Sequence, residues 1–189
     1  MSPWRMMNEW GVPRIELWTL LYQYLDKLVK KGKYIPDVAI ASGITMEDQI
    51  FKGLALGAPY FKIVGMARAP LAAVMVGKTI GKTIDSDEIP VYIRRFGRTK
   101  SEIFVTATEL QRKFGDKFDS IPTSAIGLYT YMKRLEQGLK QLMCGARKFA
   151  LEYITRDDIA SLTRKLAEIS GIRYIMDCDK EEAEKILDD

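Results

Sequence analysis

Two short apolar runs separated by one helical segment constrain the fold of this chain more than any other feature. The runs cover residues 37–41 and 60–64, and a helix is expected between them over residues 46–56. Thr45 and Asp48 form a Thr-x-x-Asp capping pattern at the start of that helix. The order strand, helix, strand predicts a β/α unit with two parallel strands, because the helix carries the chain back along the sheet.

Helical periodicity dominates the rest of the sequence. Apolar residues recur at spacings of three and four over 14–31 and over 124–149, which predicts two amphipathic helices. Mostly connecting chain is expected between residues 85 and 122, and a short strand at 173–176. Further helices are expected over 70–80, 106–114 and 180–187, and one that opens at a Thr155-x-x-Asp158 cap, turns Ile159, Leu162, Leu166 and Ile169 inward, and closes at Gly171.

Composition limits the class of protein. The 189 residues are 47% hydrophobic and 29% charged, which is typical of one globular domain with or without an extension. No stretch approaches the roughly 20 apolar residues of a membrane span, and no signal peptide is recognisable, so we expect a cytoplasmic protein that does not bind a membrane. The 29 basic and 25 acidic residues are spread along the chain, which favours a small anion over nucleic acid as a partner.

A metal site built by the protein is not expected. The chain has no histidine, and its two cysteines, Cys144 and Cys178, lie far apart without CxxC spacing. Zinc sites usually draw three or four ligands from these two residue types. Reduced structural thiols are the favoured interpretation.

Two glycine-bearing loops carry the predicted chemistry, one after each apolar run. A phosphate group requires several backbone N–H donors, a helix N-terminus and little crowding by Cβ atoms. Either loop alone would favour an ordinary tight turn, but two such loops at the ends of consecutive parallel strands favour a phosphate site. The candidate residues are Ser42, Gly43 and Ile44 in the first loop, and Gly65, Met66, Ala67 and Arg68 in the second, with Arg68 as the charged partner.

These segments resemble the glutamate synthase family, in particular its short archaeal-type members. ASGITMEDQIFKGLALGAP resembles the seventh strand and helix of the family's FMN-binding barrel, GMARAP resembles the eighth strand, and Ser2-Pro3 resembles the end of a Gly-Thr-Gly-Ala-Ser-Pro motif after the sixth. The segments MNEWGVP, FVTATELQRKFG, IPTSAIGLYTYMKRLEQGLKQLMCGARKF and YITRDDI extend the resemblance over nearly the whole chain. The implied α/β fold is a partial TIM barrel, the last two β/α units over residues 1–84, with a mainly helical C-terminal extension over 85–189.

The resemblance implies that both loops bind the FMN phosphate through backbone N–H groups. The complete enzyme would aminate 2-oxoglutarate reductively to glutamate, a small-molecule substrate. Members of the subgroup carry glycine where this chain has Ser42 and Ala67, and a backbone donor survives either change if φ stays negative. The family's iron–sulfur cysteines have no counterpart between residues 66 and 143, so no cluster is expected on this chain.

The same resemblance implies that barrel strands one to six lie outside this chain. A complete barrel typically needs about 250 residues. We therefore expect the chain to be inactive alone and to associate with a polypeptide that supplies the missing strands, or with itself. The catalytic residues and the electron donor stay unassigned. Two alternatives remain open: a truncated structural or interaction module without flavin, and part of another FMN-dependent barrel dehydrogenase.

Three further features are weighed against structural roles. Lys62 in the second strand is a catalytic candidate, although a solvated rim lysine is favoured. Glu9 and Trp10 are candidates for substrate contact on a loop. A basic cluster is interpreted as a solvated surface in preference to contact with an acidic partner subunit, and its members are Arg94, Arg95, Arg98 and Lys100.

Overall fold

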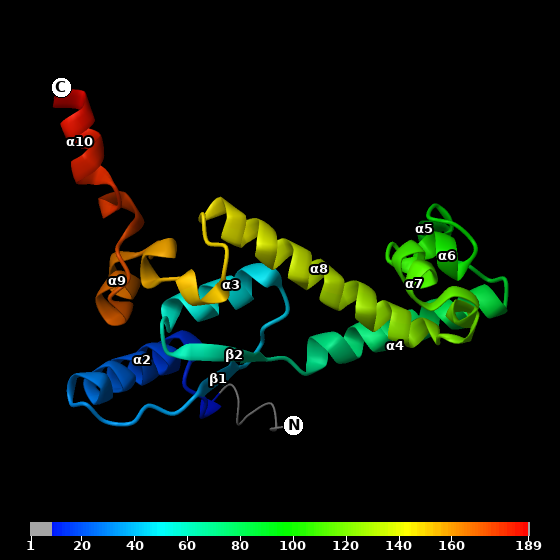
Figure 1. Ribbon diagram of the computed structural model, residues 1–189, viewed down its shortest axis with the longest axis horizontal. Helices are drawn as coiled ribbons and strands as arrows, with labels where there is room; N and C mark the ends of the chain where they lie inside the picture. Colours follow the sequence, from blue (N-terminus) through cyan, green and yellow to red (C-terminus); the bar gives the residue numbers. More distant parts are fainter. Residues whose placement is uncertain (1–8, 189) are drawn as a thin grey trace. The chain divides into compact units, whose positions relative to one another are not determined.

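The computed structural model describes residues 9–188 and is mostly helical, with one two-stranded parallel sheet (Figure 1). The chain divides into two compact units. The first comprises Met1–Gly43, Asp48–Gly65 and Gln141–Asp189, and the second comprises Ile44–Glu47 and Met66–Lys140. The expected α/β character is confirmed in this coarse form. The compact units follow a different division from the predicted boundary between residues 84 and 85.

The sheet of the first unit joins the two apolar runs. Strand β1 (Val38–Ala41) leads through α3 (Glu47–Leu56) to β2 (Phe61–Gly65), which pairs with β1 in parallel. The register places Ala41 opposite Gly65, and an irregularity near the start of the ladder leaves Lys62 without a partner. Both strands therefore end at the same edge of the sheet.

One face of the sheet is covered by α2 (Arg14–Lys30) and α3. Trp18 of α2 meets the ring of Phe61 edge-on, with 6.5 Å between ring centroids. A Cβ on Gly53 of α3 would lie 2.8 Å from Cδ1 of Ile40 and 3.4 Å from Trp18, so the glycine permits this close approach. The buried core of the first unit includes Trp18, Leu25, Val38, Ile40, Phe51, Leu54, Ala55, Leu56 and Phe61.

The segment after α8 (Thr123–Gly145) differs from the continuous helix that was predicted between Thr155 and Gly171. The Thr155–Asp158 capping box forms, but it supports only the single turn η3 (Arg156–Asp158). The chain then extends so that Ser161 bridges to Tyr174, and α9 (Arg164–Ser170) starts afresh at Thr163. Tertiary pairing thus overrides the local helical pattern, and the predicted strand at 173–176 is reduced to this one bridge. Two of the side chains expected to point inward are exposed, Leu162 by 76% and Ile169 by 38%.

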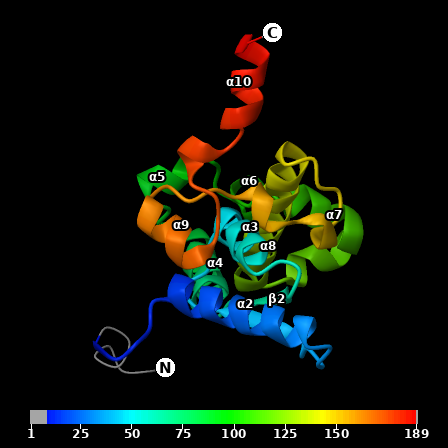
Figure 2. The ribbon, with the colours of Figure 1, turned by 90° about the vertical axis from the view of Figure 1, so that its left-hand side faces the viewer.

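Arg156 joins three helices of the first unit. Its guanidinium lies 3.9 Å from the centroid of the Tyr22 ring of α2. It donates hydrogen bonds to the carbonyl oxygens of Leu56 and Ser170, which are the last residues of α3 and α9. Figure 2 shows α9 beside α2, as their contacts require, while the terminal helix α10 (Lys180–Asp188) leads away from α9.

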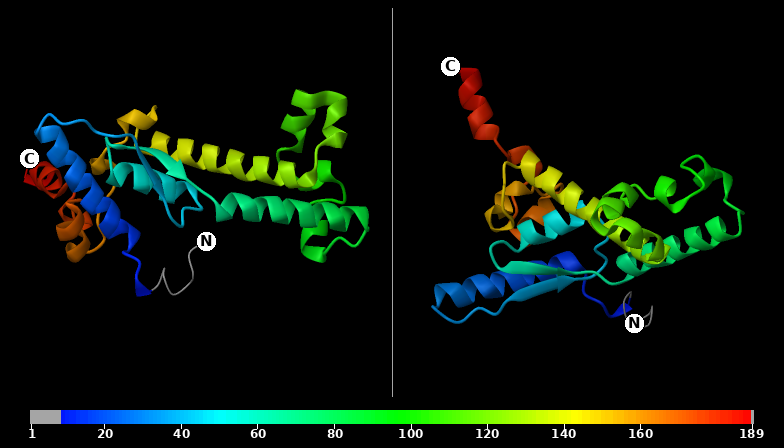
Figure 3. Two further views of the ribbon diagram at one scale, coloured as in Figure 1. Left: turned by 90° about the horizontal axis from the view of Figure 1, so that it is seen from below. Right: turned by 45° about the vertical axis from the view of Figure 1, so that its right-hand side comes forward.

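The second unit is helical. Its α4 (Arg68–Asp85) packs against the first part of α8 (Thr123–Gly145), where a Cβ on Gly77 would lie 2.6 Å from the carbonyl oxygen of Thr123. The intervening chain gathers at one end of this pair (Figure 3). It forms α5 (Val91–Arg94), α6 (Lys100–Ile103), α7 (Ala107–Phe114) and η1 (Gly115–Ser120) around a core of Phe104, Ala107, Leu110, Phe118 and Ile126. The helix expected over 106–114 is confirmed as α7, whereas α5, α6 and η1 form where connecting chain was expected.

Candidate functional site

The two strand ends of the first unit lie against each other. Because Ala41 pairs with Gly65, the loop Ser42-Gly43 leaves the sheet at the same edge as Gly65. A Cβ on Gly65 would lie 3.2 Å from the Cβ of Ala41 and 3.7 Å from the carbonyl oxygen of Ile40. A larger residue at position 65 would therefore press on β1 at the point where the first loop begins.

Backbone conformation differs between Ser42 and Ala67, the two positions at which the sequence departs from the glycines of the family that it resembles. Ser42 has φ of 118° and Gly43 has φ of 60°. Ala67 has φ of −126°, which any L-residue adopts. The condition of a negative φ is thus met at Ala67 and fails at Ser42, where a non-glycine residue costs on the order of 1–3 kcal/mol of strain. Backbone strain of this kind is concentrated at functional sites in proteins.

Arg14 is the charged residue that the structure places at this loop. Its Nη1 donates a 2.8 Å hydrogen bond to the carbonyl oxygen of Ser42, and its guanidinium lies 5.7 Å from the centroid of the Trp18 ring. A Cβ on Gly43 would lie 3.3 Å from Nη1. This role of Arg14 could not be predicted, because in the sequence the residue only marks the start of an amphipathic helix. Its distance from the loop depends on how α2 packs on the sheet.

Three of the seven predicted residues are brought together with Arg14. Ser42, Gly43 and Gly65 share the strand edge of the first unit. The other four belong to the second unit, so they are not grouped with the first three: Ile44, Met66, Ala67 and Arg68. Of these, Arg68 is exposed and begins α4, whose first turn has no acidic residue and no side-chain cap. Backbone N–H groups at such a helix start attract anions.

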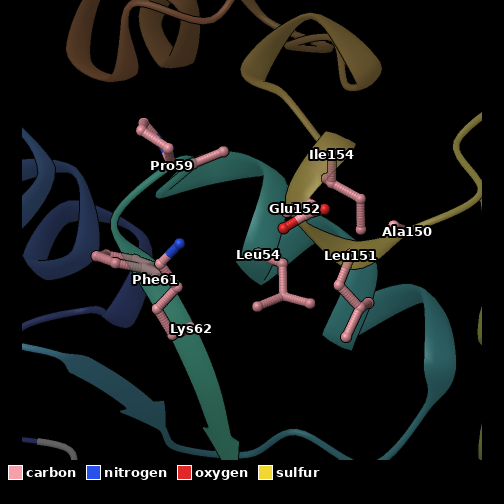
Figure 4. Close-up of a pocket in the computed structure, with 9 residues that line it drawn as sticks. Leu54, Pro59, Phe61, Lys62, Ala150, Leu151, Glu152 and Ile154 are labelled. Carbon is pink, nitrogen blue, oxygen red and sulfur yellow. The ribbon is translucent and has the colours of Figure 1, made fainter.

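Lys62 lies away from the strand ends. It lines a cavity of about 390 Å³ at the amino end of β2, together with Leu54 of α3 and the segment after α8. Figure 4 shows Leu151, Glu152 and Ile154 from that segment around the same hollow. Lys62 lies three residue positions before Gly65 along the strand, or about 10 Å away. Lys62 is therefore not one of the residues that meet at the strand ends.

The remaining candidates have simpler environments. Glu9 and Trp10 are exposed, the latter by 78%, and Ser2-Pro3 lies outside the described residues. Cys144 and Cys178 are free thiols. Over residues 9–188, no three or more His, Cys, Asp or Glu side chains are grouped as a metal site. None of the helices in that part of the chain is long and apolar enough to cross a membrane.

Comparison with known proteins gives no relative: no family model, no curated protein and no solved structure matches the chain.

Proposed function

We propose that the chain is the FMN-phosphate-binding portion of a glutamate-synthase-like oxidoreductase. The observation that carries the proposal is the shared edge of Ser42-Gly43 and Gly65, with the guanidinium of Arg14 beside it. Parallel strands of α/β proteins bind ligands at their carboxyl ends, and the loops after the last two strands of a barrel frequently hold phosphate. The resemblance of these same segments to the glutamate synthase family supplies the identity of the cofactor.

The hydrogen-bond donors at the carboxyl ends of β1 and β2 fit a phosphate group. The backbone N–H groups of Gly43 and Gly65 and the guanidinium of Arg14 would bind phosphate oxygens, since charged hydrogen bonds to a guanidinium are among the strongest in proteins. Bound FMN would supply the transfer of a hydride or of single electrons.

The sheet supports the need for a partner. Among the described residues it has only two strands, so both of its outer edges are unpaired. Ile63 of β2 is 55% exposed, and Ala39 of β1 is exposed. Open edges and an uncovered apolar face are liabilities that proteins usually cover. A polypeptide that supplies further barrel strands would cover both and would carry the contacts to the flavin ring, with the assembly working in the cytoplasm on 2-oxoglutarate and ammonia.

A direct experiment compares flavin retention with and without such a partner. The chain is purified alone and together with a glutamate-synthase-family polypeptide that carries barrel strands one to six, and visible absorbance is recorded. Flavin absorbance is expected only in the mixture. It is expected to disappear in Gly43→Val, because a β-branched residue cannot adopt φ of 60° without strain. Absence of flavin from both samples would contradict the proposal.

Arg14→Gln separates phosphate binding from general folding. Loss of one charged hydrogen bond is expected to weaken FMN binding about tenfold, with circular dichroism of the free chain unchanged. Arg95→Gln removes the same charge from the second unit and serves as the control, with no expected change. Equal affinities of the Arg14→Gln and Arg95→Gln variants for FMN would show that Arg14 only holds the loop.

A further inference from the structure

The terminal helix α10 has an apolar stripe that nothing in the described chain covers. None of its nine residues is buried, and Ile186 and Leu187 are exposed by 70% and 83%. Together with Ala183 they occupy positions i, i+3 and i+4, which lie on one side of a helix. Figure 1 shows α10 extending away from α9. Helices this short are marginal in water, so a docking partner for the stripe would stabilise α10.

The charges beside the α10 stripe are mainly negative. At 100° per residue, Glu182 borders the stripe on one side, Lys180 and then Glu184 border it on the other, and Glu181 and Asp188 lie on the opposite side of the helix. Glu184 forms a 3.7 Å ion pair with Lys180, and both side chains are largely exposed. The partner that fits this helix therefore has an apolar surface with cationic groups at its border.

The second unit carries a surface of that description, here called the α5 surface. The helical turn from Val91 to Phe96 turns Val91, Tyr92, Arg95 and Phe96 to one side, and the three apolar members are exposed by 83%, 69% and 57%. The guanidinium of Arg95 lies 4.7 Å from the centroid of the Phe96 ring. Arg98 follows directly in the chain and completes the surface.

Basic residues are concentrated in the segment that carries the α5 surface, and the Glu102 carboxylate beside it accepts a hydrogen bond from the backbone N–H of Arg98. The segment 89–101 contains four basic residues and no acidic residue. Two of them are engaged locally, since Arg94 donates to the carbonyl oxygen of Ile89 and Lys100 pairs with Asp119. The side chains of Arg95 and Arg98 form no ion pair within residues 9–188 and are exposed. Both guanidinium groups are thus available to carboxylates of a partner.

We propose that the chain associates with a second copy of itself, with α10 of each copy docked on the α5 surface of the other. Ile186 and Leu187 would pack on Tyr92 and Phe96, and Glu182 and Glu184 would meet Arg95 and Arg98. One such contact is small compared with a stable interface of about 1,600 Å². A two-fold exchange forms the contact twice in the same complex, so the two contacts together hold the dimer.

The same surface has features that suit single-stranded nucleic acid, since exposed aromatic rings stack on bases and arginines bind phosphates. Docking of α10 is favoured because the chain itself carries a helix that matches both the charge and the apolar content of the α5 surface. The inference does not depend on flavin binding, and its test uses no flavin.

A charge exchange between two variants tests the proposal by sedimentation equilibrium of the full chain. The unaltered protein is expected to dimerise, with an affinity that falls about tenfold or more on raising salt from 50 to 500 mM. Glu182→Lys with Glu184→Lys is expected to be monomeric, and so is Arg95→Glu with Arg98→Glu, because like charges face each other. An equimolar mixture of the two variants is expected to dimerise, because both contacts of the heterodimer then join opposite charges.

A matched control changes the same net charge on the other side of α10. Glu181→Lys with Asp188→Lys is expected to keep the dimer affinity within about twofold, and Ile186→Ser with Leu187→Ser is expected to abolish dimerisation without any change of charge. Circular dichroism verifies that each variant is folded. A monomeric unaltered protein, a mixture that fails to associate, or copurification of nucleic acid that is lost with Arg95→Glu and Arg98→Glu would each overturn the proposal.

Discussion

Replacing Arg156 by Met tests how the first unit is held together. The guanidinium stacks on Tyr22 and donates to the carbonyl oxygens of Leu56 and Ser170. Each hydrogen bond from a charged donor contributes about 1.5–3 kcal/mol, and a partly desolvated cation–π contact about 1–2 kcal/mol. Burial lowers the pKa of Arg156 by disfavouring its charge, which offsets part of this gain. We therefore expect Arg156→Met to lower the free energy of unfolding of the first unit by about 3 kcal/mol.

Urea unfolding followed by tryptophan fluorescence measures this loss, because Trp18 is buried in the first unit. Arg156→Lys is expected to lose an intermediate amount, since a single ammonium lacks the fork that reaches two carbonyl groups. Arg164→Met is the control. Arg164 pairs with Asp177 at 3.5 Å on the surface, so its loss is expected to cost less than about 1 kcal/mol. A cost for Arg156→Met no larger than that of the control would refute the reasoning.

Three further predictions concern the backbone and a helix cap. Ser42→Gly is expected to raise the free energy of unfolding by about 1 kcal/mol, because glycine adopts φ of 118° without side-chain strain, and unchanged or lower stability in urea would contradict this. Gly77→Ala is expected to destabilise the second unit by about 2 kcal/mol, because its Cβ would lie 2.6 Å from the carbonyl oxygen of Thr123 in α8; this clash outweighs the better helix propensity of alanine. Thermal unfolding measured by circular dichroism shows whether the variant is less stable, as expected, or more stable. The pKa of Glu102 is expected below its ordinary 4.5, because the backbone N–H groups of Arg98 and Thr99 donate to its carboxylate. The capping box that Glu102 forms with Thr99 at the start of α6 therefore stabilises the fold above about pH 4.5, and this stabilisation is lost as the pH falls through the lowered pKa. Carboxyl ¹³C NMR measures the pKa of Glu102, and a value of 4.5 or higher would be the contrary result.

Elements whose local signals agree with their tertiary surroundings were predictable. The helix over 14–30 has an apolar stripe that packs on the sheet, and the strand after Pro36 begins where proline ends any helix. The run from Phe61 to Gly65 follows Gly57-Ala58-Pro59, which closes the preceding helix. In each case the pattern of apolar residues and the helix-breaking proline or glycine indicate the same boundary.

Elements that depend on distant contacts were not predictable. Between Asp85 and Pro122 only α7 was predicted; the turns around it were missed, because Phe104 and Phe118 gain their burial by packing on Ile126, a contact that no local pattern encodes. The helix expected after Thr155 gives way to the bridge between Ser161 and Tyr174 for the same reason. At the candidate site, the glycines could be identified from their spacing, whereas Arg14 could not, because 28 residues separate it from the carbonyl that it binds.

The phosphate site is tested most directly by titrating the ¹⁵N-labelled chain with FMN and, separately, with riboflavin, which lacks the phosphate. Amide chemical shifts detect binding even in the millimolar range that is expected for a chain without a pocket for the flavin ring. The amide resonances of Gly43 and Gly65 are expected to move with FMN and to stay in place with riboflavin, and Arg14→Gln should weaken the FMN response about tenfold. Equal responses to the two flavins, or no response at either glycine, would contradict a phosphate site at the ends of β1 and β2.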